Sequence, residues 1–236
     1  MLEDFLSHLE ELRRRLVICL LFFSLAAVVC YFFSHSIIDL LTRPLHRLEN
    51  IQLFFQKPYE AFFVHLKVAA LGGFLISSPV LFTQAWFFVA PGLYEKEKKI
   101  FLPLIVISVS LFLIGAFFAY QFVIPWGLYF LLSFQTETLK PLLGVGPYFS
   151  FLIGMILGFG ILFDFPVILI GVVRLGLVRT STLAQARRVV IVLIFIAAAV
   201  LTPSPDPISQ ILLALPLMIL FEVSLIAARL VEKKKP

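Results

Sequence analysis

The chain has 236 residues, of which 61% are hydrophobic and only 14% are charged, and its mean hydropathy is +1.05. A soluble domain of this size needs more polar surface, so we expect lipid to surround most of the chain. The net charge of +5 comes from lysines and arginines clustered between apolar runs, which favours a membrane topology signal over a nucleic-acid-binding surface.

The apolar runs predict an all-α, polytopic membrane protein with one integral membrane domain. Residues 1–16 carry apolar side chains at helical spacing with charged ones between them, which indicates an amphipathic helix in the membrane interface. Six transmembrane helices are then expected, and we expect the last two to be short. Their ranges are about 17–33, 58–89, 100–132, 148–173, 189–202 and 208–228.

The segments between these spans are expected to be loops. Residues 34–56 contain Pro44 and no long apolar run, so we expect an ordered loop outside the membrane. Residues 133–147 form a second expected loop on that side, and residues 174–188 form a basic loop on the other. Within the fourth span, Gly154-x-x-x-Gly158 is a small-residue motif typical of helix contacts.

The basic residues are distributed unevenly along the chain. Of 19 lysines and arginines, 14 fall in the N-terminal segment, the turn after the second span, the basic loop and the C-terminus. Six spans place these four segments on one membrane face. By the positive-inside rule this face is cytoplasmic, so both termini are expected in the cytoplasm.

Few residues in the chain indicate chemistry. The sequence has no phosphate-binding loop, no His-Glu-x-x-His and no Gly-x-Ser-x-Gly, so we expect neither an enzyme nor a metal or cofactor. Asp164 and Glu222 lie within apolar spans, where carboxyl groups are costly and therefore functional candidates. They leave open a proton-coupled secondary transporter, although we find no internal repeat. The simpler interpretation is a bond to a neighbouring helix for Asp164 and a side chain reaching the interface for Glu222.

Two further acids, Glu11 and Glu97, lie on the same predicted membrane face. Glu97 belongs to the charged turn after Pro91-Gly92, and Glu11 precedes Arg15 by one helical turn. Two separate carboxylates could each bind one guanidinium of a ligand with paired arginines, through bidentate hydrogen bonds. The simpler interpretations are a solvated hairpin tip for Glu97 and an i,i+4 ion pair for Glu11.

Motifs along nearly the whole chain resemble those of the TatC family, the multispanning receptor subunit of the twin-arginine protein translocase. In chain order they are His8-Leu-Glu-Glu-Leu-Arg13, Pro58-x-Glu60-x-Phe62, Lys67, Pro79, Gln84-x-Trp86-x-Phe88-x-x-Pro91-Gly-Leu-Tyr-x-x-Glu97, Phe118-Ala-Tyr120, Pro125, Phe159-Gly160, Phe163-Asp-x-Pro166, Leu201-Thr-Pro203, Asp206, Ser209-Gln210, Ala214-x-Pro216 and Phe221-Glu222. Each piece is weak alone, but their order and spacing together are specific.

The resemblance implies a six-helix, cup-shaped bundle that acts as the core receptor of a protein translocase in the bacterial cytoplasmic membrane. The implied ligands are twin-arginine signal peptides of folded proteins, and the implied driving force is the proton-motive force. The implied partners are single-span TatA/TatB-type subunits, further copies of the chain and membrane lipid. The implied site residues are Glu11, Glu97, Arg13 and Phe88 for the signal peptide, Thr202 and Gln210 for partner docking, Asp164 inside the cup, and Pro44 and Asp206 in structural loops.

Overall fold

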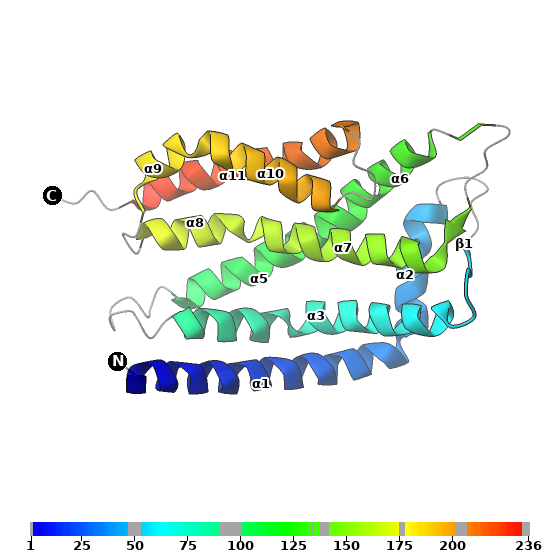
Figure 1. Cartoon of the computed structure of the whole chain (residues 1–236), viewed down its shortest axis with the longest axis horizontal. Coiled ribbons are helices and arrows are strands. Elements are labelled where there is room, and N and C mark those ends of the chain that lie inside the picture. Colours follow the sequence, from blue (N-terminus) through cyan, green and yellow to red (C-terminus); the bar gives the residue numbers. More distant parts are fainter. Residues whose placement is uncertain are drawn as a thin grey trace. The chain divides into compact units, whose positions relative to one another are not determined.

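Helices account for almost all of the secondary structure in the computed structural model of the chain (Figure 1). The structure describes residues 2–46, 53–89, 101–133, 135–136, 142–174, 178–201 and 207–232. Within these ranges, five helical segments are long and apolar enough to cross a membrane: His8–Phe32, Glu60–Phe88, Leu102–Leu132, Val145–Val173 and Leu213–Leu230. The prediction of an all-α polytopic chain is confirmed.

The chain divides into two compact units, which are described separately. The first comprises Met1–Thr42 and Phe55–Ser110, and the second comprises Arg43–Phe54 and Leu111–Pro236.

In the first unit, helix α1 (Leu2–Phe32) packs along helix α3 (Glu60–Val89), and the two run in opposite directions (Figure 1). We expected an amphipathic helix over 1–16 and a separate span over 17–33, but α1 is one continuous helix. The reason is that residues 2–32 contain neither proline nor glycine, so nothing interrupts the helical hydrogen bonds.

Small residues set the spacing of α1 and α3. A Cβ atom added at Gly73 would lie 2.7 Å from the backbone nitrogen and Cα of Ala27. A Cβ atom at Gly72 would lie 2.8 Å from Sγ of Cys30. These glycines let the two backbones approach closely, as is common where helices meet in a membrane.

Helix α3 continues through Pro79 because a side chain replaces the missing backbone donor. Proline has no N–H, so the carbonyl of Leu75, four residues earlier, loses its helical partner. The hydroxyl of Ser78 donates to that carbonyl at 2.7 Å. Within lipid such a replacement satisfies a carbonyl that water cannot reach.

The expected loop over 34–56 is corrected, because residues Ser34–His46 form helix α2. Thr42 donates from Oγ1 to the carbonyls of Ile38 and Asp39, and Leu41 and Leu45 are buried. Pro44 lies inside this helix, two residues before its last residue. A helix of 13 residues needs only an apolar stripe, so the absence of a long apolar run does not exclude it.

In the second unit, a wide helical turn interrupts the third predicted span. The span comprises α5 (Phe101–Phe118), the π-helix η2 (Ala119–Val123) and α6 (Ile124–Leu132), and its residues from Leu111 onward belong to this unit. Ile124 donates its N–H to the carbonyl of Ala119, five residues earlier. Pro125 follows directly, and a π-turn is a known way to accommodate a disturbance in the helical ladder.

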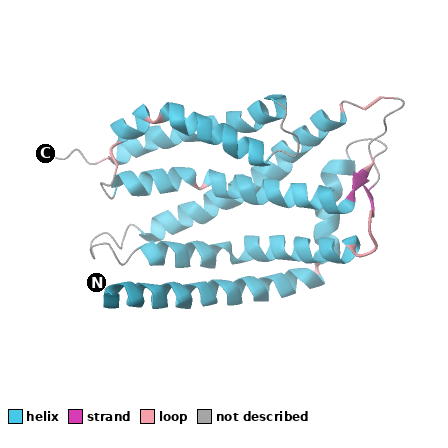
Figure 2. Cartoon of the chain, viewed as in Figure 1, coloured by secondary structure: helices cyan, strands magenta, loops and turns pink. Residues whose placement is uncertain are grey.

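The fourth predicted span consists of α7 (Val145–Phe163) and α8 (Phe165–Arg174), separated at Asp164. The segment before it contains strand β2 (Leu143–Gly144), which pairs in parallel with β1 (Leu53–Phe54), the two small strands in Figure 2. Both strands lie where we expected only loops. Two-residue strands have no sequence pattern of their own, so the pairing was not predictable.

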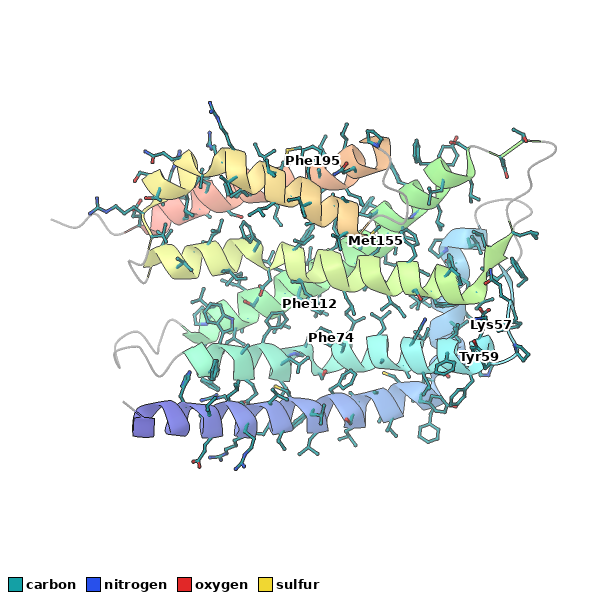
Figure 3. All side chains as sticks on the ribbon, in the orientation of Figure 1. Lys57, Tyr59, Phe74, Phe112, Met155 and Phe195 are labelled. Carbon is teal, nitrogen blue, oxygen red and sulfur yellow. The ribbon has the colours of Figure 1, made fainter. Side chains whose placement is uncertain are left out.

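Helix α7 also contains the Gly154-x-x-x-Gly158 motif, and the structure contradicts a contact role within the chain for Gly154. A Cβ atom at Gly154 would meet nothing within 4 Å. The close approach uses other glycines: Gly160 faces the ring of Phe112, the fully buried side chain labelled in Figure 3, and Gly115 faces the carbonyl of Phe159.

The chain ends with α9 (Thr180–Gln185), α10 (Arg187–Leu201) and α11 (Pro207–Val231), and both α8 and α10 pack on α11. Helix α10 has 15 residues, about 22 Å, and is short for a hydrocarbon core of about 30 Å. Helix α11 has 25 residues, so it is longer than expected, although its membrane-spanning window is only Leu213–Leu230.

Candidate functional site

The start of α1 contacts the end of α3. The rings of His8 and Phe88 stack with their centroids 4.5 Å apart and an angle of 26° between their planes. A second contact joins the same two helices: Cζ of Arg15 on α1 lies 5.7 Å from the centroid of the Phe87 ring on α3. Because the two helices are antiparallel, the first residues of α1 meet the last residues of α3, although they lie far apart in the sequence. Phe88, a predicted site residue, therefore lies beside the helical turn that leads to Glu11.

Glu11 is paired in this structure. Its Oε1 accepts a hydrogen bond of 3.1 Å from Nε of Arg15 and a second bond from a terminal nitrogen of the same guanidinium. The side chains are 20% exposed for Arg15 and 32% exposed for Glu11. The predicted i,i+4 pair is therefore present, and it is partly shielded from water. Arg13, the other predicted residue on this helix, is exposed.

The second carboxylate of the predicted pair cannot be placed. Glu97 and its neighbour Glu95 both fall between Val89 and Phe101, outside the described residues. Their approach to Glu11 remains a prediction. The described residues show the ion pair of Glu11 with Arg15 and the aromatic contacts at the end of α3, and the role of Glu11 in binding a ligand stays a prediction.

Asp164 is buried, with 7% of its surface exposed, at the break between α7 and α8. Its N–H donates to the carbonyl of Ile161 at 3.1 Å, and its own carbonyl accepts from Val167 at 3.0 Å. Pro166, the second residue of α8, has no N–H to donate. Asp164 is therefore a buried polar residue at a local interruption of the helix, and its functional role stays a prediction.

We expect Asp164 to serve as a hydrogen-bonding group within the apolar span. Asp164→Asn keeps the size and hydrogen-bonding capacity without a charge, so transport in cells should be retained better than in Asp164→Leu or Asp164→Lys. Transport of a reporter carrying a twin-arginine signal peptide, normalised to the amount of protein in the membrane, measures this. Equal losses for Asn and Leu at normal protein levels would contradict a polar role.

Glu222 has a different environment from Asp164. Its Oε2 lies 2.9 Å from a terminal nitrogen of Arg187, and the two side chains are 47% and 44% exposed. This ion pair gives Glu222 an ordinary structural contact that requires no proton relay.

The predicted partner-docking and loop residues are only partly described. Gln210 donates from Nε2 to the carbonyl of Phe195 at 2.8 Å and so links α11 to α10. Pro44 lies within α2. Thr202 and Asp206 fall outside the described residues. Among the residues that the structure describes, no group of three or more histidines, cysteines or acids could hold a metal ion.

One charged contact was missed from the sequence. Glu232, after the last helix, accepts hydrogen bonds from both the hydroxyl and the N–H of Thr180, the latter at 3.2 Å, and so caps the start of α9. These bonds lower the pKa of the Glu232 carboxyl below its ordinary value. The Thr180-Ser181-Thr182 run predicted a helix start correctly, but nothing local indicated a partner 52 residues away.

Fold and site together define a multispanning, all-α membrane protein with a paired carboxylate at one end of its first two long helices. The model of the family described as Sec-independent protein translocase protein (TatC) matches residues 7–216. The chain belongs to the TatC family.

Curated relatives and solved structures agree with this assignment. The TatC protein of Magnetococcus marinus is 41% identical over 231 residues, covering 97% of this chain and 85% of the relative. That of Aquifex aeolicus is 36% identical over 232 residues, covering 97% and 96%. A crystal structure of a twin arginine translocase receptor, TatC, superposes with a TM-score of 0.85 at 35% identity, covering 96% of this chain and all of the other. The chain is therefore a multispanning translocase subunit of the twin-arginine pathway and not an enzyme.

Proposed function

We propose that this chain binds the twin-arginine signal peptides of folded proteins through Glu11 and Glu97. The observation that supports the proposal is the junction of α1 and α3, where Phe88 stacks on His8 one turn before Glu11. The helix that carries Phe88 is also the one that precedes the turn with Glu97.

The chemistry of two arginines requires two acceptors. Adjacent side chains of an extended peptide point to opposite faces, so one carboxylate cannot bind both guanidinium groups. A carboxylate binds a guanidinium through two parallel hydrogen bonds, a geometry that lysine cannot reproduce. The bonds between Glu11 and Arg15 support the proposal, because they already join this carboxylate to a guanidinium.

The test is a titration of the purified protein in lipid nanodiscs with a labelled signal peptide. An Arg-Arg peptide should bind, and the same peptide with Lys-Lys should bind more weakly. Equal affinity of the protein for the two peptides would contradict the proposal.

The remaining roles complete the proposed function. TatA/TatB-type single-span subunits would dock near Thr202 and Gln210, and further copies of the chain would join them in a larger complex. Transport would use the proton-motive force. Arg13 and Phe88 would contribute to the signal-peptide surface beside Glu11.

For the membrane topology, we propose that both termini and the Glu95 turn lie in the cytoplasm of the bacterium, because 14 of 19 basic residues fall on that face. A cysteine at Lys98, in a chain whose native Cys19 and Cys30 are replaced, should react with an impermeant maleimide only after the cells are opened. A cysteine at Lys140 should react in intact cells. Labelling at position 98 in intact cells would contradict the proposed topology.

A further inference from the structure

Arg15 presents to Glu11 the same chemical group that the proposed ligand would present. Two nitrogens of its guanidinium bond to Oε1 of Glu11. In the proposed complex a guanidinium from the signal peptide binds both carboxylate oxygens of Glu11, and Oε1 is the one that Arg15 occupies. Glu11 therefore holds an internal substitute for the ligand when no peptide is bound.

The surroundings of Arg15 set it apart from the neighbouring arginines. Its side chain is only 20% exposed, whereas Arg13 and Arg14 are exposed on the helix surface. The same guanidinium also lies near an aromatic ring, with its Cζ 5.7 Å from the centroid of the Phe87 ring on α3. A guanidinium over an aromatic ring is attracted to its face. Arg15 could thus leave Glu11 and keep a favourable contact.

We infer that Arg15 is an intramolecular competitor that occupies Glu11 until the arginine pair of a signal peptide displaces it. The inference rests on the proposed function, because it assigns a regulator to the same carboxylate. The apparent affinity of a ligand falls by the fraction of protein in which its site is free. Arg15 therefore lowers the affinity of every ligand that binds Glu11. A ligand whose cation forms fewer hydrogen bonds than a guanidinium, such as a lysine ammonium, does not displace Arg15 from Glu11.

The test compares Arg15→Gln with Arg14→Gln. Both substitutions remove one positive charge from neighbouring positions of α1, but only the first releases Glu11. In a titration with the Arg-Arg signal peptide, Arg15→Gln should bind roughly two- to fivefold more tightly than Arg14→Gln, the range expected for losing a partly exposed ion pair. In a Glu11→Gln background the two substitutions should have the same effect, since no carboxylate remains to compete for.

The outcomes separate this inference from the proposed function. If Arg15→Gln binds the peptide no more tightly than Arg14→Gln, or more weakly, Arg15 is a structural partner of Glu11 and the inference is overturned. A wild-type protein that does not distinguish Arg-Arg from Lys-Lys peptides would instead defeat the proposed function. If Arg15→Gln fails to accumulate, Arg15→Lys decides, because lysine keeps the charge but forms a weaker pair; it should give a smaller gain of the same sign, and no gain overturns the inference.

Discussion

Replacing Glu97 or Glu11 by alanine should weaken binding of an Arg-Arg signal peptide about tenfold to a hundredfold. The loss of one partner of a charge-assisted hydrogen bond costs about 1.5–3 kcal/mol, which corresponds to that range. The membrane interface has a lower effective dielectric than bulk water and strengthens each pair. Equilibrium titration of the purified variants with labelled peptide measures the effect.

The matched control is Glu95→Ala, which removes a carboxylate two residues from Glu97 and should have a much smaller effect. A Lys-Lys peptide should lose less affinity than the Arg-Arg peptide in both Glu97→Ala and Glu11→Ala, because it makes fewer bonds to begin with. If Glu95→Ala is as harmful as Glu97→Ala, the turn acts as a diffuse acidic surface, and a specific pair of carboxylates is wrong.

Gly115→Ala should destabilise the protein by about 1–3 kcal/mol, the usual cost of an extra methyl group in a packed core. The added Cβ would lie 2.6 Å from the carbonyl oxygen of Phe159 and 2.6 Å from Cβ of Phe163. Neither atom is the end of a flexible side chain, so relief requires the backbones to separate. Thermal unfolding of the purified protein in detergent should show a lower midpoint.

Gly154→Ala supplies the control for this prediction. It adds the same methyl group to a helix of the same unit, where nothing lies within 4 Å. Alanine favours helix over glycine by about 0.5–1 kcal/mol, so the midpoint should stay unchanged or rise. If Gly154→Ala proves the more harmful of the two, the close contacts of the second unit are misplaced.

Hydropathy was sufficient to predict the long helices, because an apolar run in lipid must satisfy its backbone hydrogen bonds within itself and a helix does so. It failed for α2, whose 13 residues form a helix through an apolar stripe rather than an apolar run. The widened turn before Pro125 and the paired strands β1 and β2 depend on tertiary packing. Composition alone does not specify either feature.

For the site, spacing alone predicted the pair of Glu11 and Arg15, since residues four apart on a helix are neighbours. The stacking of Phe88 on His8 joins residues from opposite ends of two helices, and only the resemblance to TatC had placed Phe88 at the site. We predicted a helix contact at Gly154, whereas the close contacts are at Gly115 and Gly160. The spacing of glycines does not reveal which face of a helix meets its neighbour.

The contacts of the last two helices bear on how this part of the chain can move. Arg187, at the start of α10, is bonded to Glu222 of α11, and Gln210, near the start of α11, is bonded to the carbonyl of Phe195 in α10. Glu232 adds a third connection from the end of α11 to α9. Sliding of α10 along α11 would break both bonds together, so we expect the two helices to move as one rigid body.

The protonation of Glu232 sets the pH range of its own connection to α9. Because its pKa is lowered in the folded chain, the contribution of Glu232 to stability is complete above the ordinary glutamate pKa and is lost only as the pH falls through the lowered value. At neutral pH Glu232 therefore keeps its connection to α9. A single-span partner bound near Gln210 would act on α9, α10 and α11 at once.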